Sequence, residues 1–179
     1  SRYGIELWEA LIKNGNQFGL TPYGTEAMHV LRAERGFIIV GQETDGTVSP
    51  IDLGMDWIIS KKKKDFIGKR SLERASMKQN DRKELVGLLS DDPNTVIPEG
   101  AHAIDEKDLE LEEKNILGHV TSSYFSSNCK RSIAMALIKN GRARKGNKLV
   151  IPLLNGDKIK AKIVNPVFFD PNGVRKNVI

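Results

Sequence analysis

The sequence lacks the features that mark several classes of protein. It has one cysteine, Cys129, so an internal disulfide is excluded and a reducing compartment is favoured. No apolar run approaches the ~20 residues of a membrane-spanning helix, and no secretory signal peptide opens the chain. Metal-ligand clusters, nucleophile triads and glycine-rich phosphate loops are also missing from the sequence. We therefore expect a cytoplasmic protein with neither a membrane segment nor a metal site.

The charge that is present comes in blocks. Residues 56–83 hold ten Lys and Arg against four acids, residues 91–113 hold nine acids against Lys107, and residues 130–148 hold seven Lys and Arg without an acid. The net charge is +5. Such segregation indicates a polyanionic ligand or a charged partner surface, and a solvated surface on a basic protein is an equal alternative.

The first half of the chain has a helical pattern. Apolar residues recur at three- and four-residue spacing over residues 4–14, which predicts a helix. The Thr-Pro pair at 21–22 is typical of a helix start, so we expect a second helix from there to a left-handed cap at Gly36. Short apolar runs at residues 37–40 and 55–60 predict two strands.

From residue 82 the pattern changes to short strands separated by Gly and Asx turns. Five strands are predicted, over residues 85–90, 118–123, 133–138, 148–153 and 158–164. Residues 153–158 read as a two-strand hairpin that turns at Asn155 and Gly156. Five or six short antiparallel strands in ~85 residues are typical of a small barrel or sandwich. The fold class is therefore α+β, with a domain boundary near residues 79–83.

One residue breaks a local rule. Helix C-termini carry partial negative charge and favour cations, yet Glu34 lies in the last turn of the second predicted helix, between Arg32 and Arg35. Because functional residues often violate local rules, Glu34 is a candidate ligand-binding residue. The structural alternative is an ion pair with Arg32 or Arg35, which contributes little to the stability of the fold when it is exposed.

A series of motifs resembles the glycine-cleavage T-protein (aminomethyltransferase) family. In the first half these motifs are Leu31-Arg32-Ala33-Glu34, Pro50-Ile51-Asp52-Leu53-Gly54-Met55-Asp56-Trp57 and Asp65-Phe66-Ile67-Gly68-Lys69. In the second half they are Leu85-Val86-Gly87-Leu88, Gly118-His119-Val120-Thr121-Ser122-Ser123 and Ser132-Ile133-Ala134-Met135-Ala136-Leu137. The resemblance implies that residues 1–81 are the C-terminal part of a folate-binding, ferredoxin-like α/β sandwich. It implies that residues 82–179 are a small C-terminal antiparallel β-barrel with a tail.

Within this family, the stretch from Pro22 to Gln42 is similar to the C-terminal region of the alpha subunits of heterotetrameric sarcosine oxidases. The similarity implies a tetrahydrofolate-binding, one-carbon-transfer region of an enzyme that oxidatively demethylates sarcosine to glycine and forms 5,10-methylenetetrahydrofolate. It also implies beta, gamma and delta subunits as partners, FAD and FMN in the beta subunit, and NAD in the N-terminal part of alpha. Because the chain opens in a helical pattern without Met, we expect a piece of a longer protein that is inactive alone.

The resemblance assigns site residues only where the motifs match. Glu34 matches the family's pterin-holding glutamate, and a carboxylate can accept two N–H groups of a pterin edge. Lys63 lies close to the family's arginine for the folate tail, although lysine lacks the bidentate geometry of arginine. Tyr124 is a candidate to stack on the ligand, with ordinary packing as its alternative. The family's catalytic aspartate falls upstream, so no catalytic residue is expected in this chain.

Two other functions stay open at this point. A stand-alone aminomethyltransferase, or the folate domain of a dimethylglycine dehydrogenase, fits the same motifs. A basic RNA-binding module fits the positive charge, but the basic blocks lack the interleaved aromatic residues that stack on bases. We therefore expect a small-molecule substrate and protein partners rather than nucleic acid.

Overall fold

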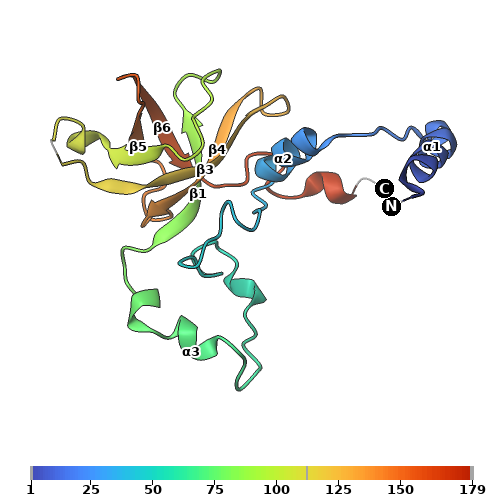
Figure 1. Ribbon diagram of the computed structural model, residues 1–179. Helices are drawn as coiled ribbons and strands as arrows, with labels where there is room; N and C mark the ends of the chain where they lie inside the picture. The colour runs from blue at the N-terminus through green and yellow to red at the C-terminus, as the bar shows by residue number, and fades with distance from the viewer. Residues whose placement is uncertain (1, 112, 178–179) are drawn as a thin grey trace.

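A closed antiparallel barrel forms the centre of the computed structural model, which describes residues 2–111 and 113–177. The strand order around the barrel is β1-β4-β3-β2-β5-β6, and β1 closes it by pairing with β6 (Figure 1). The strands are β1 (Lys83–Ser90), β2 (His102–Asp105), β3 (Ile116–Ser126), β4 (Arg131–Lys139), β5 (Lys148–Pro152) and β6 (Lys158–Val164). Closure gives each of these six strands two neighbours, so none of the described strands is an edge that could pair with another chain.

The five strands predicted from the sequence are confirmed, and β2 is the one that the prediction missed. β2 has four residues, and its register with β3 shifts between Ala103 and Ile104. A strand this short, interrupted by a register shift, carries no alternation that a sequence pattern can reveal. The predicted hairpin is also confirmed, because Leu153 N donates to the Asp157 carbonyl at 2.8 Å and Gly156 has a φ of +87°.

Three α-helices precede the barrel: α1 (Gly4–Gly15), α2 (Thr25–Glu34) and α3 (Lys69–Leu72). α1 forms where it was predicted, but α2 begins later than expected because Gly24 is extended and takes the N-cap position. Thr21 lies in the connection between α1 and α2, where its hydroxyl donates to the Gly19 carbonyl at 3.4 Å. Short 3₁₀ turns cover Asn16–Phe18, Asp56–Ile58, Ala75–Met77, Glu106–Asp108 and Val174–Asn177. None of the described helices is long and apolar enough to cross a membrane.

The strands predicted at residues 37–40 and 55–60 do not form. Val40 makes only an isolated bridge with Thr44, and the second run folds into a 3₁₀ turn. Trp57 in that turn is 75% exposed, so the apolar run is not covered by a neighbouring strand in the described part of the chain. The α+β class and the small antiparallel barrel are confirmed, although no named strand lies within residues 2–81.

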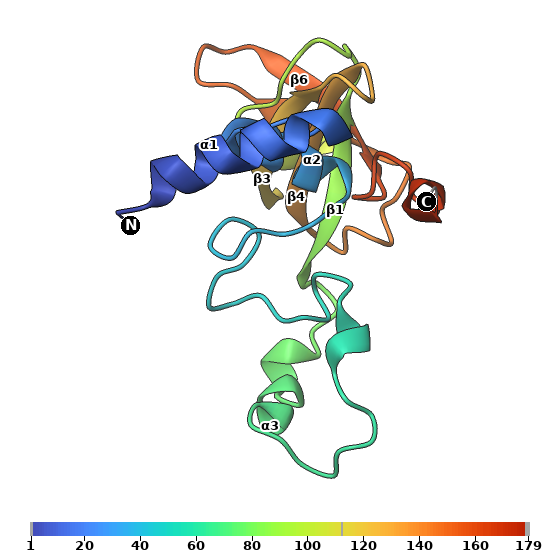
Figure 2. The same ribbon diagram turned by 90° about the vertical axis from the view of Figure 1, so that its right-hand side faces the viewer.

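Two apolar clusters stabilise the barrel. The interior cluster is built from alternate strand residues such as Leu88, Ile138 and Ile163, which are fully buried. The outer cluster surrounds Met135 and receives Ala33 from α2, which contacts β3 and β4 (Figure 2). Apart from Ala33, every fully buried apolar side chain among the described residues belongs to the barrel region.

Residues 58–81 project from the lower end of the barrel and contain α3; we call this segment the basic lobe (Figures 1 and 2). Arg82 joins it to the rest of the molecule. Its guanidinium donates to both carboxylate oxygens of Asp52, at 2.8 and 2.5 Å, and to the carbonyls of Thr47 at 2.7 Å and Ser76 at 3.0 Å. Burial alone would raise the pKa of Asp52, but the hydrogen bonds from Arg82 and Ser49 outweigh it and hold the pKa below its ordinary value.

Candidate functional site

α2 ends in a glycine cap that also makes room for the C-terminal tail. Gly36 has a φ of +69°, Phe37 N donates to the Arg32 carbonyl at 2.9 Å, and Gly36 N donates to the Ala33 carbonyl at 3.0 Å. These two bonds form a Schellman motif, so the predicted left-handed cap is confirmed. A Cβ on Gly36 would lie 2.8 Å from the carbonyl oxygen of Pro166, so only glycine permits this close approach.

Glu34 lies at this helix end with its carboxylate turned into the protein. The residue is 2% exposed, and its two carboxylate oxygens accept hydrogen bonds from Ser126 Oγ at 2.6 Å and Asn128 Nδ2 at 2.9 Å. Both donors come from the end of β3 and the turn that follows it. The alternative of an ion pair with Arg32 or Arg35 is wrong, because those guanidinium groups bind other carboxylates. The two donors offset the unfavourable position of an acid at a helix C-terminus.

A second buried carboxylate, Glu43, lies beside the same helix and was not predicted from the sequence. Arg32 donates to Glu43 at 2.9 Å, to the Gln42 side chain at 2.9 Å and to Ser122 Oγ at 2.6 Å, and Ser122 donates to the other Glu43 oxygen. Glu43 is 0% exposed and Arg32 is 9% exposed, so each charge depends on the other for compensation. This network fastens α2 and the turn after it to β3.

The C-terminal tail completes the junction between α2 and the barrel. The backbone N–H groups of Phe168 and Phe169 donate to the Glu34 carbonyl at 2.9 and 3.0 Å. Arg35 pairs with Asp170 at 3.1 Å. Helix ends leave carbonyls without intrahelical partners, and the tail satisfies one of them here. The region after β6 is therefore part of the site.

Tyr124 occupies the same junction, two residues before Ser126 on β3. The guanidinium carbon of Arg32 lies 5.9 Å from the Tyr124 ring centroid, and the His29 ring lies 6.5 Å away at an interplanar angle of 70°. A cation–π contact and an edge-on aromatic contact together fix the orientation of a half-buried ring. The structure thus brings two of the three predicted site residues, Glu34 and Tyr124, to one α2–β3 junction.

Lys63, the third predicted residue, lies elsewhere. It is an exposed residue of the basic lobe, where its backbone N–H donates to Ser60 Oγ at 3.3 Å. It lines a pocket of about 490 Å³ together with Ile59 and Phe66. The lobe projects away from α2, so the structure does not bring Lys63 to the junction that holds Glu34 (Figure 2).

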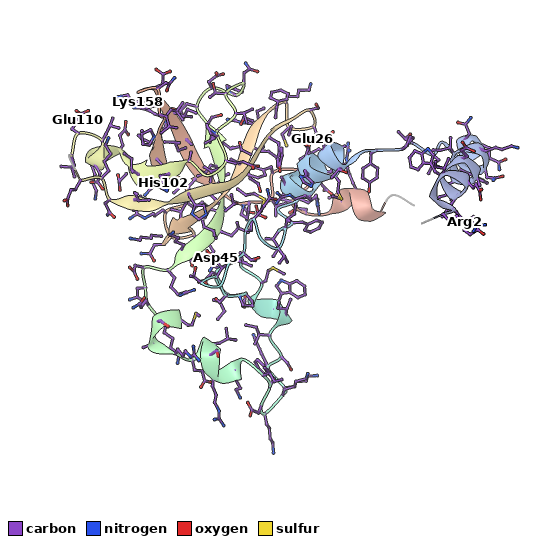
Figure 3. All side chains as sticks on the ribbon, viewed as in Figure 1. Arg2, Glu26, Asp45, His102, Glu110 and Lys158 are labelled. Carbon is purple, nitrogen blue, oxygen red and sulfur yellow. The ribbon has the colours of Figure 1, made fainter. Side chains whose placement is uncertain are left out.

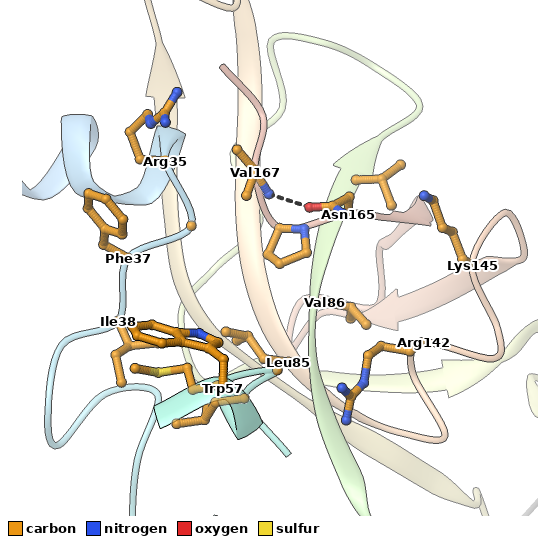
Figure 4. A pocket seen from close by; sticks show the side chains of 16 residues that line it. Arg35, Phe37, Ile38, Trp57, Leu85, Val86, Arg142, Lys145, Asn165 and Val167 are labelled. Atoms are coloured by element: carbon orange, nitrogen blue, oxygen red, sulfur yellow. Dashed lines mark hydrogen bonds between the residues drawn. The ribbon is translucent and has the colours of Figure 1, made fainter. Parts of the chain in front are cut away.

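A separate pocket, which we call the tail pocket, opens next to the glycine cap. It has a volume of about 530 Å³ and lies between residues 35–38, the turn at residues 53–57, β1 and the start of the tail at residues 164–167 (Figure 4). Apolar side chains such as Leu85 and Val167 line much of it. No local sequence pattern indicates this pocket, because five separate segments build it, including the connection between β4 and β5 that carries Arg142 and Lys145.

The two aromatic rings of the tail pocket share one side with Arg35, and two further cations lie across from them. Phe37 and Trp57 are on one side, and Arg142 and Lys145 are on the other (Figure 4). Arg142 is engaged by Glu84, with its Nε 3.0 Å from a carboxylate oxygen. Lys145 is exposed and forms no ion pair with a described residue. Aromatic surface facing cations suits a ligand with a flat ring at one end and a carboxylate at the other.

In the folded chain, acidic side chains of residues 91–113 lie next to basic side chains. Three of these acidic residues form ion pairs with cations of the second basic block and of β6; the pairs are Lys148–Asp91, Arg144–Asp105 and Lys160–Glu106. The separation of charge along the sequence is therefore partly cancelled on the barrel surface. No group of three or more His, Cys, Asp or Glu side chains in the described part is arranged to hold a metal ion.

Family comparisons cover both halves of the chain. Residues 1–63 match the model of the GCVT N-terminal domain, and residues 83–170 match the glycine cleavage T-protein C-terminal barrel domain. The chain belongs to the glycine-cleavage T-protein family. The second of these models describes a barrel domain, and it matches the part of this T-protein-family chain that forms the closed barrel.

Sarcosine oxidase alpha subunits and aminomethyltransferases are both among the relatives of this T-protein-family chain. Sarcosine oxidase subunit alpha from Corynebacterium sp. (strain P-1) is 48% identical over 178 residues, which are 99% of this chain and 18% of that protein. The Rhizobium meliloti (strain 1021) subunit of the same name is 38% identical over 177 residues, 98% of this chain and 18% of that protein. An aminomethyltransferase from Thermoanaerobacter pseudethanolicus is 31% identical over 175 residues, 96% of this chain and 44% of that protein.

The fold is shared with a solved relative. The crystal structure of the glycine cleavage system aminomethyltransferase T from Bartonella henselae superimposes with a TM-score of 0.76 and 25% sequence identity. The match covers 94% of this chain and 44% of that one. The chain thus spans less than half the length of its aminomethyltransferase relatives and about a fifth of the sarcosine oxidase subunits.

Proposed function

We propose that this chain is the tetrahydrofolate-binding, one-carbon-transfer portion of a sarcosine oxidase alpha subunit. The observation that carries the proposal is the 48% identity with such a subunit, which extends over 99% of the chain and so includes both family-model segments. Tetrahydrofolate is the acceptor of the one-carbon unit that sarcosine demethylation releases. The residues of this chain bind and orient that acceptor, and the catalytic aspartate is expected outside it.

The tail pocket is the part of the chain that we propose for contact with folate. Folate carries flat rings at one end and a glutamate with two carboxylates at the other. Phe37 and Trp57 offer surfaces on which a ring can stack, and Lys145 offers a cation without an ion-pair partner among the described residues. The chemistry of the pocket therefore fits both ends of the ligand.

The contacts predicted for Glu34, Lys63 and Tyr124 stay predictions. Because both oxygens of Glu34 accept hydrogen bonds from Ser126 and Asn128, we propose that Glu34 acts as a positioning residue. It holds the end of α2, and through its carbonyl the tail, beside the tail pocket. Glu34 is 2% exposed, so a ligand that gripped the carboxylate directly would have to displace the groups that cover it, which costs free energy.

The larger assembly is part of the same proposal. We propose beta, gamma and delta subunits and the rest of the alpha chain as partners in a cytoplasmic heterotetramer, with FAD, FMN and NAD bound outside this region. A second function, a stand-alone aminomethyltransferase, is favoured only by the 31% identity with the Thermoanaerobacter enzyme. Formation of methylenetetrahydrofolate from sarcosine, rather than from an aminomethyl-lipoyl donor, separates the two.

The test measures tetrahydrofolate binding to the full-length alpha subunit by calorimetry. Trp57→Ala should raise Kd about tenfold, because it removes a stacking surface. Trp8→Ala is the matched control, since Trp8 is the other tryptophan and lies on α1, and it should leave Kd within about twofold. After assembly of each variant with the other subunits, oxidation of sarcosine without folate should be the same in both.

Three results decide the proposal. No binding by the wild-type subunit would overturn the folate function itself. An unchanged Kd for Trp57→Ala would show that tetrahydrofolate does not bind in the tail pocket. Glu34→Gln keeps an oxygen acceptor and the shape of the side chain, so a positioning role predicts a Kd within about threefold of wild type, whereas a direct grip on the pterin predicts a much larger loss.

A further inference from the structure

We propose that Arg35 is a ligand-binding residue of the tail pocket, and that its guanidinium group donates two hydrogen bonds to a carboxylate of the bound ligand. The inference rests on the proposed function, because tetrahydrofolate is the ligand that brings the carboxylate. It adds a contact that was not among the site residues assigned from the sequence, and it gives the C-terminal tail a role in that contact.

Arg35 lies where α2, the tail and the tail pocket meet. It takes the C-cap position of α2, and it lines the pocket on the same side as Phe37 (Figure 4). Its side chain is 21% exposed, so the guanidinium group is neither sealed inside the protein nor fully solvated. A cation in this position interacts with a ligand in the pocket more strongly than an exposed cation would, because less water screens its charge.

One edge of the guanidinium group is fixed by the C-terminal tail. Nη1 lies within hydrogen-bond distance of the Phe169 carbonyl at 3.0 Å, of the Asp170 carbonyl, and of the Asp170 carboxylate at 3.1 Å. That carboxylate is itself held, because it accepts hydrogen bonds from the backbone N–H groups of Val174 at 2.8 Å and Arg175 at 3.3 Å. These bonds order a long side chain in advance, so ligand binding does not bear that loss of entropy.

The other edge of the guanidinium group is open. All the hydrogen bonds that the Arg35 side chain donates within the described residues use Nη1, so Nε and Nη2 have no described partner. The buried side-chain nitrogen atoms without a partner in the described part belong to Arg32 and Arg131, so Nε and Nη2 of Arg35 are not buried. The N–H groups on this edge point the same way and match the two oxygens of a carboxylate.

The charges around the pocket favour an anion. Arg35, Arg142 and Lys145 line it, and no acid is among the described residues that do. Glu84 balances the charge of Arg142. Asp170 likewise balances Arg35, so the open edge supplies hydrogen bonds and direction, whereas Lys145 supplies unbalanced positive charge. Folate carries two carboxylates, and Arg35 and Lys145 offer it one donor group on each side of the pocket (Figure 4).

The alternative is that Arg35 only fastens the tail to α2. Other groups share that task, because the backbone N–H groups of Phe168 and Phe169 donate to the Glu34 carbonyl at 2.9 and 3.0 Å. Fastening also needs only the Nη1 edge. A purely structural role therefore predicts that the carboxylates of the ligand make no difference to the effect of an Arg35 substitution.

The experiment measures, by calorimetry, how the full-length alpha subunit binds tetrahydrofolate and its diamide, in which both glutamate carboxylates are amides. Arg35→Gln removes the charge and the open edge, and Arg35→Lys keeps the charge without the fork. Arg2→Gln is the matched control, because Arg2 lies just before α1 and away from the tail pocket (Figure 3). Hydrogen exchange of residues 166–177 reports whether the tail stays seated in each variant.

We expect Arg35→Gln to raise the Kd for tetrahydrofolate at least about tenfold, because a bidentate, charge-assisted contact is lost. Arg35→Lys should recover only part of that affinity. Both variants should change the Kd for the diamide by less than about threefold, since a neutral amide gains less from an arginine fork. Arg2→Gln should stay within about twofold of wild type for both ligands.

Three outcomes would overturn the inference. Equal losses of affinity for tetrahydrofolate and the diamide, together with faster exchange of the tail, would assign Arg35 a structural role. An unchanged Kd for tetrahydrofolate in Arg35→Gln would exclude the contact and leave the folate function intact. No binding of tetrahydrofolate by the wild type would overturn the proposed function and this inference with it. If Arg35→Gln does not fold, the same comparison of ligands in Arg35→Lys decides between the two roles.

Discussion

The barrel buries Leu88 and Ile163 completely, whereas α1 leaves Ile5 76% exposed, Trp8 55% exposed and Leu11 54% exposed. Both regions contain regular secondary structure with an apolar face. The barrel covers its apolar face with its own strands, because closure turns one side of every strand toward a common interior. α1 has no buried residue at all.

This difference shows that forming a regular helix or strand and burying its apolar face have separate requirements. The periodicity of residues 4–14 is sufficient to predict a helix, but a core needs a second surface at the right distance. In the barrel that second surface comes both from neighbouring strands and from distant ones, as in the pairing of β1 with β6, where Gly87 lies opposite Val164. The barrel is therefore the region in which substitutions should have the largest effects on stability.

The largest effect is expected where two barrel strands approach most closely. A Cβ on Gly118 in β3 would lie 1.8 Å from the carbonyl oxygen of Leu137 in β4. Gly118→Ala should therefore cost at least about 4 kcal/mol of unfolding free energy or prevent folding. Gly46→Ala is the control, because nothing lies within 4 Å of its added Cβ, and it should be close to neutral. Urea unfolding measures both, and equal stability of the two variants would contradict the close approach.

The next effect compares the same chemical change in the two regions. Leu88→Ala removes a side chain with 0% exposure and should cost about 3 kcal/mol, from lost burial and the cavity that remains. Leu11→Ala removes a side chain with 54% exposure and should cost less than about 0.5 kcal/mol. Chemical denaturation of each variant measures the difference. An equal loss of unfolding free energy for Leu11→Ala would show that α1 is buried as fully as the interior of the barrel.

The smallest effect concerns the ion pair between Arg82 and Asp52, which joins the basic lobe to the rest of the molecule. Asp52→Asn leaves Arg82 with a neutral partner and should cost about 2 kcal/mol at pH 7, less than for a fully buried pair because Arg82 is partly exposed. Since the pKa of Asp52 is lowered in the folded state, its contribution is present above the unfolded value of about 3.9 and is lost as pH falls through the folded pKa.

Unfolding curves recorded at several values of pH test this link. The difference in unfolding free energy between wild type and Asp52→Asn should be largest at neutral pH and should decrease below about pH 4. A gap that stays constant down to pH 2 would show that the carboxylate charge is not what holds the lobe. Asp45→Asn is not a suitable control, because the pKa of Asp45 is also lowered, first by the Thr47 hydroxyl.

Local chemistry made some features of the site predictable. Gly36 was expected to end α2 in a left-handed conformation, and the Schellman bonds confirm it, because the cap depends on neighbouring residues only. The five predicted strands were found for a similar reason, since turn residues and β-rich composition are local signals. Glu34 was also recognised as exceptional from its position alone.

Other features depended on contacts that no local pattern encodes. The donors to Glu34 lie 92 and 94 residues away along the chain, and the partner of Arg32 proved to be Glu43 rather than Glu34. The strands predicted at residues 37–40 and 55–60 failed because a strand exists only when another strand pairs with it. The tail pocket was missed because its walls come from five separate segments.

The sequence by itself determined the α+β class, five of the six barrel strands, the glycine cap and the membership in the glycine-cleavage T-protein family. The first three follow from residue types at short or regular spacing, and the family follows from the resemblance of its ordered motifs. Only the tertiary structure decided that the Glu34 carboxylate faces Ser126 and Asn128, that Lys63 lies apart from Tyr124, and that Trp57 and Lys145 share a pocket. Hydrogen bonds and apolar contacts act over a few ångströms, so these outcomes depended on which distant residues the closed barrel brought together.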